Sequence, residues 1–289
     1  MKAKYFLFAI CALAAIIACI ITCGGNNKKE NTSDTDVEKN STSKSAQPLN
    51  ISIYLDLSDR LMREMSPSQK DRDIAIVDYI ADYFKAQTLG PDILQSKNSI
   101  KIFFYPAPNR SDIATLAEEL NVDMQNYSGK DKRIALEEMK DKFTRNLMAI
   151  YGKTMADKNW PGCDIWDFFS NKDVDVQCVR EGFRNILVIL TDGYLFDENH
   201  KLKEGSAYSY VLPQTLQDPQ SSLIIRRTGL ENLEVRILEV NPYDINHRDR
   251  LKSVLENWLK GMGVKEENIT VSQTSLPTNT QTVIKSFLN

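Results

Sequence analysis

Apolar and polar residues alternate in a regular order from residue 49 to the end of the chain. Alternating or continuous apolar runs predict strands, and apolar residues three or four positions apart predict helices. The predicted strands cover residues 49–57, 99–105, 185–190, 233–240 and 269–273. The predicted helices cover residues 71–87, 111–120, 134–151, 164–169, 249–262 and 281–288. Because strands and helices alternate, we expect an α/β fold with a doubly wound, mostly parallel central sheet and helices on both faces.

The segment NILVIL (Asn185–Leu190) is the most apolar of the predicted strands. A strand buried on both faces carries such a run, so we place it at the centre of the sheet. The stretch from Tyr194 to Leu230 is too long for a simple connection. We interpret residues 195–211 as a β-hairpin insertion that turns around Asn199 and His200.

The N-terminus carries the pattern of an export signal. Lys2 and Lys4 precede a run without charge from Tyr5 to Thr22, and a basic start before an apolar core is typical of a secretory signal. The segment resembles a bacterial lipoprotein signal, which is cut before a cysteine that then carries lipid. Residues 1–22 are therefore interpreted as the signal. The resemblance implies an exported protein of the cell envelope, lipid-anchored to a bacterial membrane.

Two cysteines compete for the lipid. Cys19 follows a small residue, Ala18, whereas Cys23 follows a bulkier residue but leads into two glycines and a polar tail. Both assignments stay open, as does an uncleaved single-span anchor. Residues 23–48 are almost devoid of apolar side chains, so they predict a flexible polar tether. A single domain is expected over residues 49–289.

Composition excludes several classes of function. The chain of 289 residues has 36 basic and 39 acidic residues and a formal net charge of −3, which gives no electrostatic reason to expect nucleic acid. Only two histidines are present, which nearly excludes histidine-based metal and acid–base sites. Cys163 and Cys178 are the only cysteines in the predicted domain, and they are either free or paired in a disulfide.

Two polar motifs follow predicted strands. Asp56-Leu57-Ser58-Asp59-Arg60 closes the first strand, and Thr191-Asp192-Gly193 closes the central one. Ligands bind beyond the carboxyl ends of the strands in an open α/β sheet. A hydroxyl and two carboxylates at one edge suit a hard cation such as Mg²⁺ or Mn²⁺.

The two motifs together resemble a von Willebrand factor type A (vWA) domain, which has a Rossmann-like fold. In that family, a metal-ion-dependent adhesion site takes an Asp and two Ser from the first loop, a Thr from a middle loop and an Asp after the fourth strand. Asp56, Ser58 and Asp192 match three of these ligands. The resemblance covers roughly residues 50–289.

Two positions depart from the family pattern. Arg60 stands at the second Ser position, and Cys163 stands at the Thr position. A neutral thiol is a poor ligand for Mg²⁺. A guanidinium at position 60 would lie where the cation belongs and would pair with Asp56 or Asp192. The site is thus either a cation site or a degenerate, metal-free one.

The resemblance implies a binding module rather than an enzyme. An unidentified protein or peptide partner would place an acidic side chain on the cation, or on Arg60 where Arg60 replaces the cation. One alternative is a Mg²⁺-dependent phosphohydrolase of the haloacid-dehalogenase type, which needs a second Asp where this chain has Ser58. Another is a scaffold whose hairpin insertion carries the binding.

Overall fold

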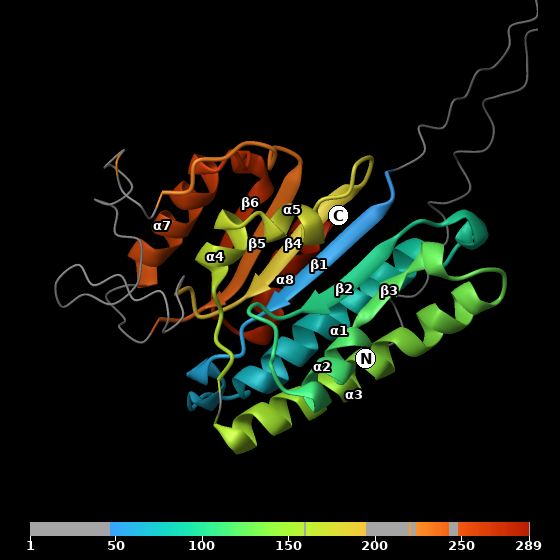
Figure 1. Ribbon diagram of the computed structural model, residues 1–289, viewed down its shortest axis with the longest axis horizontal. Coiled ribbons are helices and arrows are strands. Elements are labelled where there is room, and N and C mark those ends of the chain that lie inside the picture. Colours follow the sequence, from blue (N-terminus) through green and yellow to red (C-terminus); the bar gives the residue numbers. More distant parts are fainter. Residues whose placement is uncertain (1–46, 159, 195–219, 221–223, 243–247, 289) are drawn as a thin grey trace, which may run out of the picture. The chain divides into compact units, whose positions relative to one another are not determined.

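Strands β1 (Leu49–Leu55) and β4 (Arg184–Leu190) lie side by side at the centre of a six-stranded sheet (Figure 1). In this computed structural model the strand order is β3-β2-β1-β4-β5-β6. β2 (Ser99–Phe103), β5 (Leu233–Val240) and β6 (Ile269–Gln273) continue the parallel sheet, while β3 (Asn121–Asp123) pairs antiparallel with β2. The predicted mostly parallel sheet with NILVIL at its centre is confirmed.

The structure describes residues 47–158, 160–194, 220, 224–242 and 248–288. The signal over residues 1–22, nearly all of the tether over residues 23–48 and the hairpin insertion near 195–211 lie outside the described residues. They therefore stay predictions. Within the described ranges, no helix is both long and apolar enough to cross a membrane.

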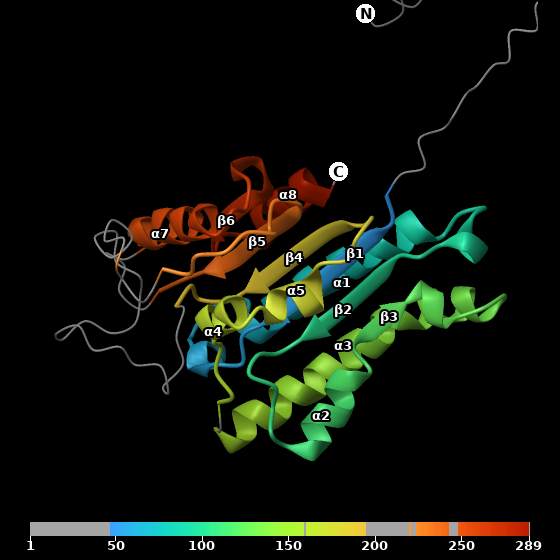
Figure 2. The same ribbon diagram turned by 45° about the horizontal axis from the view of Figure 1, so that its top comes forward.

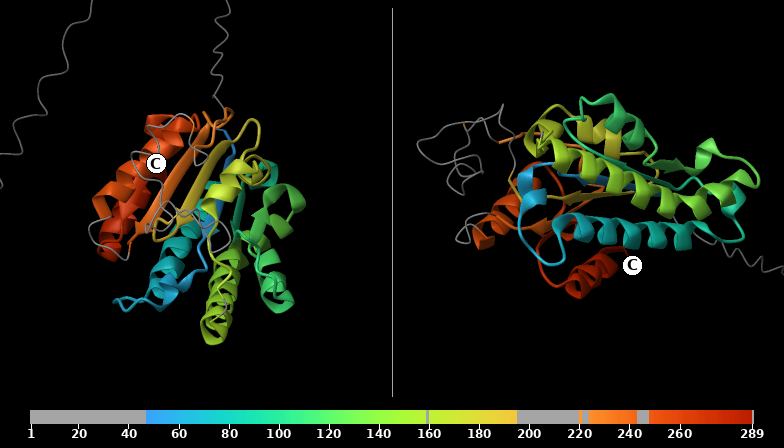
Figure 3. Two further views of the ribbon diagram at one scale, coloured as in Figure 1. Left: turned by 60° about the vertical axis from the view of Figure 1, so that its left-hand side comes forward. Right: turned by 90° about the horizontal axis from the view of Figure 1, so that it is seen from below.

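Helices cover both faces of the sheet, as predicted (Figures 2 and 3). One apolar cluster joins the sheet to α1 (Gln69–Thr88), α2 (Ser111–Glu118), α3 (Asp131–Asp157) and α8 (Pro277–Leu288). A second cluster on the opposite face joins it to α4 (Ile165–Ser170), α5 (Asp173–Cys178) and α7 (Arg248–Gly261). Four short 3₁₀ helices complete the described elements: η1 (Asp59–Met62), η2 (Ile93–Gln95), η3 (Met124–Asn126) and η6 (Glu266–Asn268).

Side-chain alternation along β1 divides the core into these two clusters. Ile51, Ile53 and Leu55 pack on the side of α1 and α3, while Tyr54 packs against Phe168 of α4 on the other side. All seven residues of β1 are buried. A central strand covered on both faces has this pattern, which is why its sequence is apolar almost throughout.

Several details differ from the sequence-based expectations. α3 runs from Asp131 to Asp157, well beyond the predicted 134–151, because the polar residues at both ends continue the helix. β3 and α5 were not predicted: the first is only three residues long and the second reads as alternating polar and apolar. α2 begins at Ser111, as predicted, but ends at Glu118, and no side-chain cap hydrogen bond is formed at its start. Cys163 and Cys178 are both free and buried, so they form no disulfide.

Two backbone irregularities shape the edge of the sheet where β4 and β5 end. Gly193 has φ +102°, and a Cβ there would lie 2.6 Å from Leu251 Cδ2, so this turn requires glycine. Glu239 has φ +65° beside a register shift between Ile237 and Val240. Beyond it, the Asn241 N–H donates to Asp192 O at 3.0 Å, which fixes the two strand ends together.

Candidate functional site

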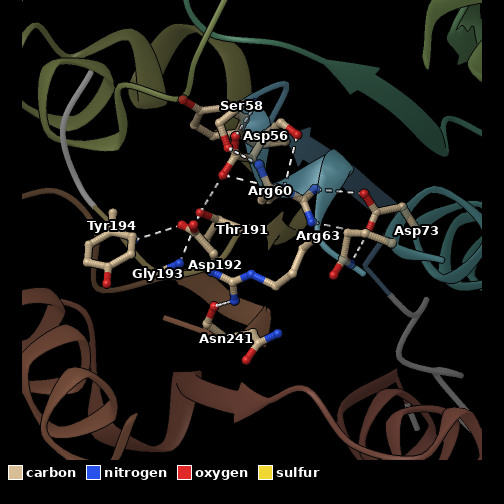
Figure 4. A network of polar contacts seen from close by, with 12 residues as sticks. Asp56, Ser58, Arg60, Arg63, Asp73, Thr191, Asp192, Gly193, Tyr194 and Asn241 are labelled. Atoms are coloured by element: carbon tan, nitrogen blue, oxygen red, sulfur yellow. Dashed lines mark hydrogen bonds and ion pairs between the residues drawn. The ribbon is translucent and has the colours of Figure 1, made fainter. Parts of the chain in front are cut away.

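The two polar motifs meet where β1 and β4 end (Figure 4). Leu55 and Leu190 are the last paired residues of the two strands, so Asp56 and Thr191 follow them as neighbours. The Thr191 hydroxyl donates to Asp56 Oδ2 at 2.9 Å, and the Ser58 N–H donates to Asp56 Oδ1 at 2.8 Å. Both oxygens of the Asp56 carboxylate therefore have partners inside the protein, and the residue is only 1% exposed.

Arg60 lies on η1, the short helix that begins directly after Ser58. Ser58 is the N-cap of this short helix, and its Oγ accepts a hydrogen bond from the Arg60 N–H at 3.5 Å. The Arg60 side chain turns back under the loop, where its Nε donates to Asp56 O at 3.2 Å and lies 3.4 Å from Asp56 Oδ2. The local turn thus places a guanidinium against the first carboxylate of the motif.

The far end of the Arg60 guanidinium pairs with Asp73 of α1. Nη2 donates to Asp73 Oδ2 at 2.6 Å. Gln69 Nε2 donates to the other carboxylate oxygen of Asp73 at 2.9 Å, and the Tyr151 hydroxyl of α3 donates to Oδ2 at 2.9 Å. This group, here called the Arg60 network, joins the sheet edge to α1 and α3.

Arg60 remains charged in this buried position. It is 2% exposed, and burial alone would lower its pKa. The negative charges of Asp73 and Asp56 outweigh burial and raise the pKa of Arg60 above its ordinary value. The guanidinium points toward Asp73 and away from Asp192 (Figure 4), so the sequence-based pairing holds for Asp56, while no ion pair links Arg60 to Asp192 within the described residues.

Asp192 lies beside this network but outside it. Its Oδ1 accepts a hydrogen bond from the Tyr194 N–H at 3.2 Å, and the residue is 6% exposed. Burial raises the pKa of Asp192 to about 7, and the negative charge of Asp56 acts in the same direction. The charges of Arg60 and Arg63 lower it only in part. Asp192 is therefore a carboxylate whose negative charge the protein compensates incompletely.

Cys163 comes to the same edge from the loop before α4. An antiparallel bridge between Leu57 and Gly162 brings this loop against the first motif. Cys163 is 5% exposed and contacts Tyr54, and burial raises the pKa of its thiol well above the ordinary value. The charge of Asp56 acts in the same direction, so the thiol stays neutral. All five sequence-predicted positions, Asp56, Ser58, Arg60, Cys163 and Asp192, are thus brought together.

The donor set at this edge disfavours a divalent cation. Asp56 is shared between Thr191 and Arg60, Ser58 Oγ caps its own helix, and Cys163 offers a neutral thiol. Two unit charges about 4 Å apart repel by about 4 kcal/mol at an effective dielectric constant of about 20, so Arg60 opposes a cation at Asp56. Within the described ranges, no group of three or more His, Cys, Asp or Glu side chains is placed to hold a metal ion.

Sequence reasoning missed Asp73, Gln69 and Tyr151. A signal was present: Asp73 lies four residues before Val77 and seven before Ile80, on the apolar stripe of α1. A carboxylate on a core-facing stripe needs a buried partner, because an unpaired buried charge is very costly. Its partner could not be named, since η1 and α1 are joined by a loop whose path the pattern does not specify.

No protein-family model matches the chain, and no curated protein matches it. Solved structures with a similar fold include an aerotolerance-related membrane protein from Bacteroides fragilis, with 13% identity, a TM-score of 0.37, and coverage of 83% of this chain and 98% of that one. BatB from Bacteroides thetaiotaomicron has 13% identity, a TM-score of 0.38 and coverage of 82% and 98%. The pilus adhesin SpaC from Lactobacillus rhamnosus GG has 11% identity, a TM-score of 0.42 and coverage of 85% of this chain but 30% of the adhesin.

The Arg60 network should contribute strongly to the stability of the fold. Asp73→Asn leaves the buried guanidinium with only Asp56 as its anionic partner, and breaking a buried ion pair from one side costs about 3–5 kcal/mol. We expect this loss in the free energy of unfolding, measured by urea denaturation. The matched control is Asp82→Asn on the same helix, which breaks an exposed pair with Lys140 and should cost at most about 1 kcal/mol. Equal losses in the two variants would contradict the prediction.

Proposed function

We propose that this chain is a binding module of the bacterial cell envelope, anchored by lipid at Cys19 or Cys23, with a vWA-type domain. Its binding site for a protein or peptide partner is the carboxyl edge of the sheet. The observation that carries the proposal is the convergence of Asp56, Ser58, Cys163 and Asp192 at the ends of β1 and β4. Carboxyl ends of strands are where open α/β sheets bind their ligands.

We further propose that the site works without a resident Mg²⁺ or Mn²⁺. Arg60 supplies the positive charge next to Asp56 that a cation would supply in the family pattern. Its guanidinium is held from both sides by Asp56 and Asp73, so it is a fixed part of the fold.

A phosphohydrolase of the haloacid-dehalogenase type is the weaker candidate. Such an enzyme needs a nucleophilic Asp at the end of the first strand, reachable by substrate. Asp56 is 1% exposed, and both of its carboxylate oxygens accept hydrogen bonds from Ser58 and Thr191. These contacts favour a binding role over catalysis. Turnover of an aryl phosphate in the presence of Mg²⁺ would reverse this preference.

Export and lipidation can be tested by metabolic labelling with a fatty acid. The wild type should carry the label, because a basic start and an apolar run lead to two cysteines in the setting of a lipid attachment site. Cys19→Ala and Cys23→Ala, made singly and together, should identify the attachment residue, and the double variant should carry no label. Cys11→Ala, inside the apolar run, is the control and should keep it. Label that survives in the double variant rules out the lipid anchor.

Partner capture should depend on Asp192 and be insensitive to chelation. Envelope proteins cross-linked to the wild type should be recovered equally with and without EDTA, because the site needs no dication. Asp192→Ala should lose them, whereas Glu138→Ala, which removes an exposed carboxylate on α3, should not. If capture persists in Asp192→Ala, the edge of the sheet is not the functional site. The hairpin-scaffold alternative would then gain support.

The family's cation site should be recoverable by substitution. The variant combines Arg60→Ser, Asp73→Asn and Cys163→Thr. Two hydroxyls then replace the guanidinium of Arg60 and the thiol of Cys163, and Asp73→Asn removes the carboxylate that would otherwise lose its partner. We expect Mg²⁺ or Mn²⁺ affinity at least tenfold above that of the wild type, measured by titration calorimetry, because hard dications prefer oxygen ligands. Asp73→Asn alone is the control and should gain nothing. Tight binding by the wild type, with no gain in the variant, would contradict a metal-free site.

A further inference from the structure

Arg60 cannot serve as the receptor for a partner's carboxylate. Its guanidinium is 2% exposed, and it is already bound by Asp56 on one side and Asp73 on the other. A partner carboxylate would have to displace Asp73, which is itself completely buried and held by Gln69 and Tyr151. The expectation that an acidic side chain binds on Arg60 is therefore not supported by this geometry.

Asp192 has one carboxylate oxygen without a partner among the described residues. Its Oδ1 accepts from Tyr194, but within the described part of the chain its Oδ2 accepts no hydrogen bond and forms no ion pair. The residue is 6% exposed, so its side chain is almost but not completely enclosed. An almost enclosed carboxylate whose second oxygen has no donor among the described residues can accept a hydrogen bond from a partner, and a charged donor binds such an oxygen most strongly.

The charges around Asp192 favour a positive donor. Asp56 lies close enough to oppose its ionisation, and Arg60 is turned toward Asp73. The positive charge of Arg63 acts on Asp192 and lowers its pKa only in part, and the Arg63 guanidinium donates from Nη1 to the carbonyl of Asn241 (Figure 4). Asp59, on the neighbouring helix η1, is an exposed acid. A positive group placed on Oδ2 offsets the repulsion between Asp192 and Asp56, whereas an acidic group adds to it.

We propose that the partner binds this site through a basic side chain, an arginine or lysine, whose charged group contacts Asp192. This inference rests on the proposed function and reverses the charge of the partner group that the metal-based pattern implies. A guanidinium or ammonium on a flexible stem can reach a recessed oxygen without the full ligand shell that a dication demands.

The test uses two capped pentapeptides that differ only at their central residue, arginine in one and glutamate in the other. The full chain, labelled with ¹⁵N in detergent micelles, is titrated with each, and the amide resonances of Gly193 and Tyr194 are followed. The arginine peptide should shift both resonances saturably. Asp192→Asn should weaken this binding at least tenfold, while Glu138→Gln should leave it unchanged.

Three outcomes overturn the inference: shifts caused by the glutamate peptide instead, shifts by the arginine peptide that survive Asp192→Asn, or no shift with either peptide. Its failure is distinguishable from failure of the proposed function. If capture of the partner is lost in Asp192→Ala while the arginine peptide does not bind, the site stands and its partner chemistry is wrong. If capture is unaffected by Asp192→Ala, the proposed function itself falls.

Discussion

The buried ion pair between Arg60 and Asp73 determines how the carboxyl edge of the sheet is built. Among the described residues Arg60 is the only cationic partner of Asp73, whereas Arg60 also contacts Asp56. A buried ion that loses its partner has lost its hydration without compensation, so removing either side chain is costly. Arg60 comes from the loop after β1 and Asp73 from the first turns of α1, so the pair fixes that loop against that helix. The hydroxyl of Tyr151 extends the same constraint to α3. The first motif consequently has a defined geometry although it lies in a connecting segment.

The neighbouring residue on α1 forms a second buried pair, which holds the other half of the edge. Arg72 Nε donates to Glu239 Oε2 at 2.7 Å, and its Nη2 donates to Glu239 Oε1 at 2.9 Å. Glu239 has a positive φ, a conformation that costs energy for a residue with a Cβ, and the bidentate pair with Arg72 offsets that cost. Glu239 lies two residues before Asn241, whose N–H donates to the carbonyl oxygen of Asp192. Adjacent residues of one helix thus position the ends of both β1 and β5.

Much of this fold could be predicted from the sequence, because a strand that is buried on both faces has a continuous run of apolar residues. NILVIL is central because only a strand covered on both sides carries such a run, and the structure places β4 between β1 and β5. The short β3 leaves almost no trace, because one apolar residue among three does not define a period. The convergence of Asp56 and Asp192 followed from strand direction alone. The identity of Arg60's main partner did not, because a contact between a loop and a helix depends on the loop's path.

The side chains at positions 60 and 163 are consistent with each other in physical terms. A hydroxyl at either position would add an oxygen ligand for a hard cation, whereas the Arg60 guanidinium already places a positive charge beside Asp56. Once Arg60 is fixed, a side chain at position 163 contributes by packing, and a buried thiol behaves there as a small apolar group beside Tyr54. Arg60 pairs with Asp56 and Asp73 and leaves Asp192 without an ion pair among the described residues. Asp192 therefore differs from the other two carboxylates of this edge, because its buried charge has no fixed counter-charge in contact with it in the described part of the chain, and burial raises its pKa to about 7.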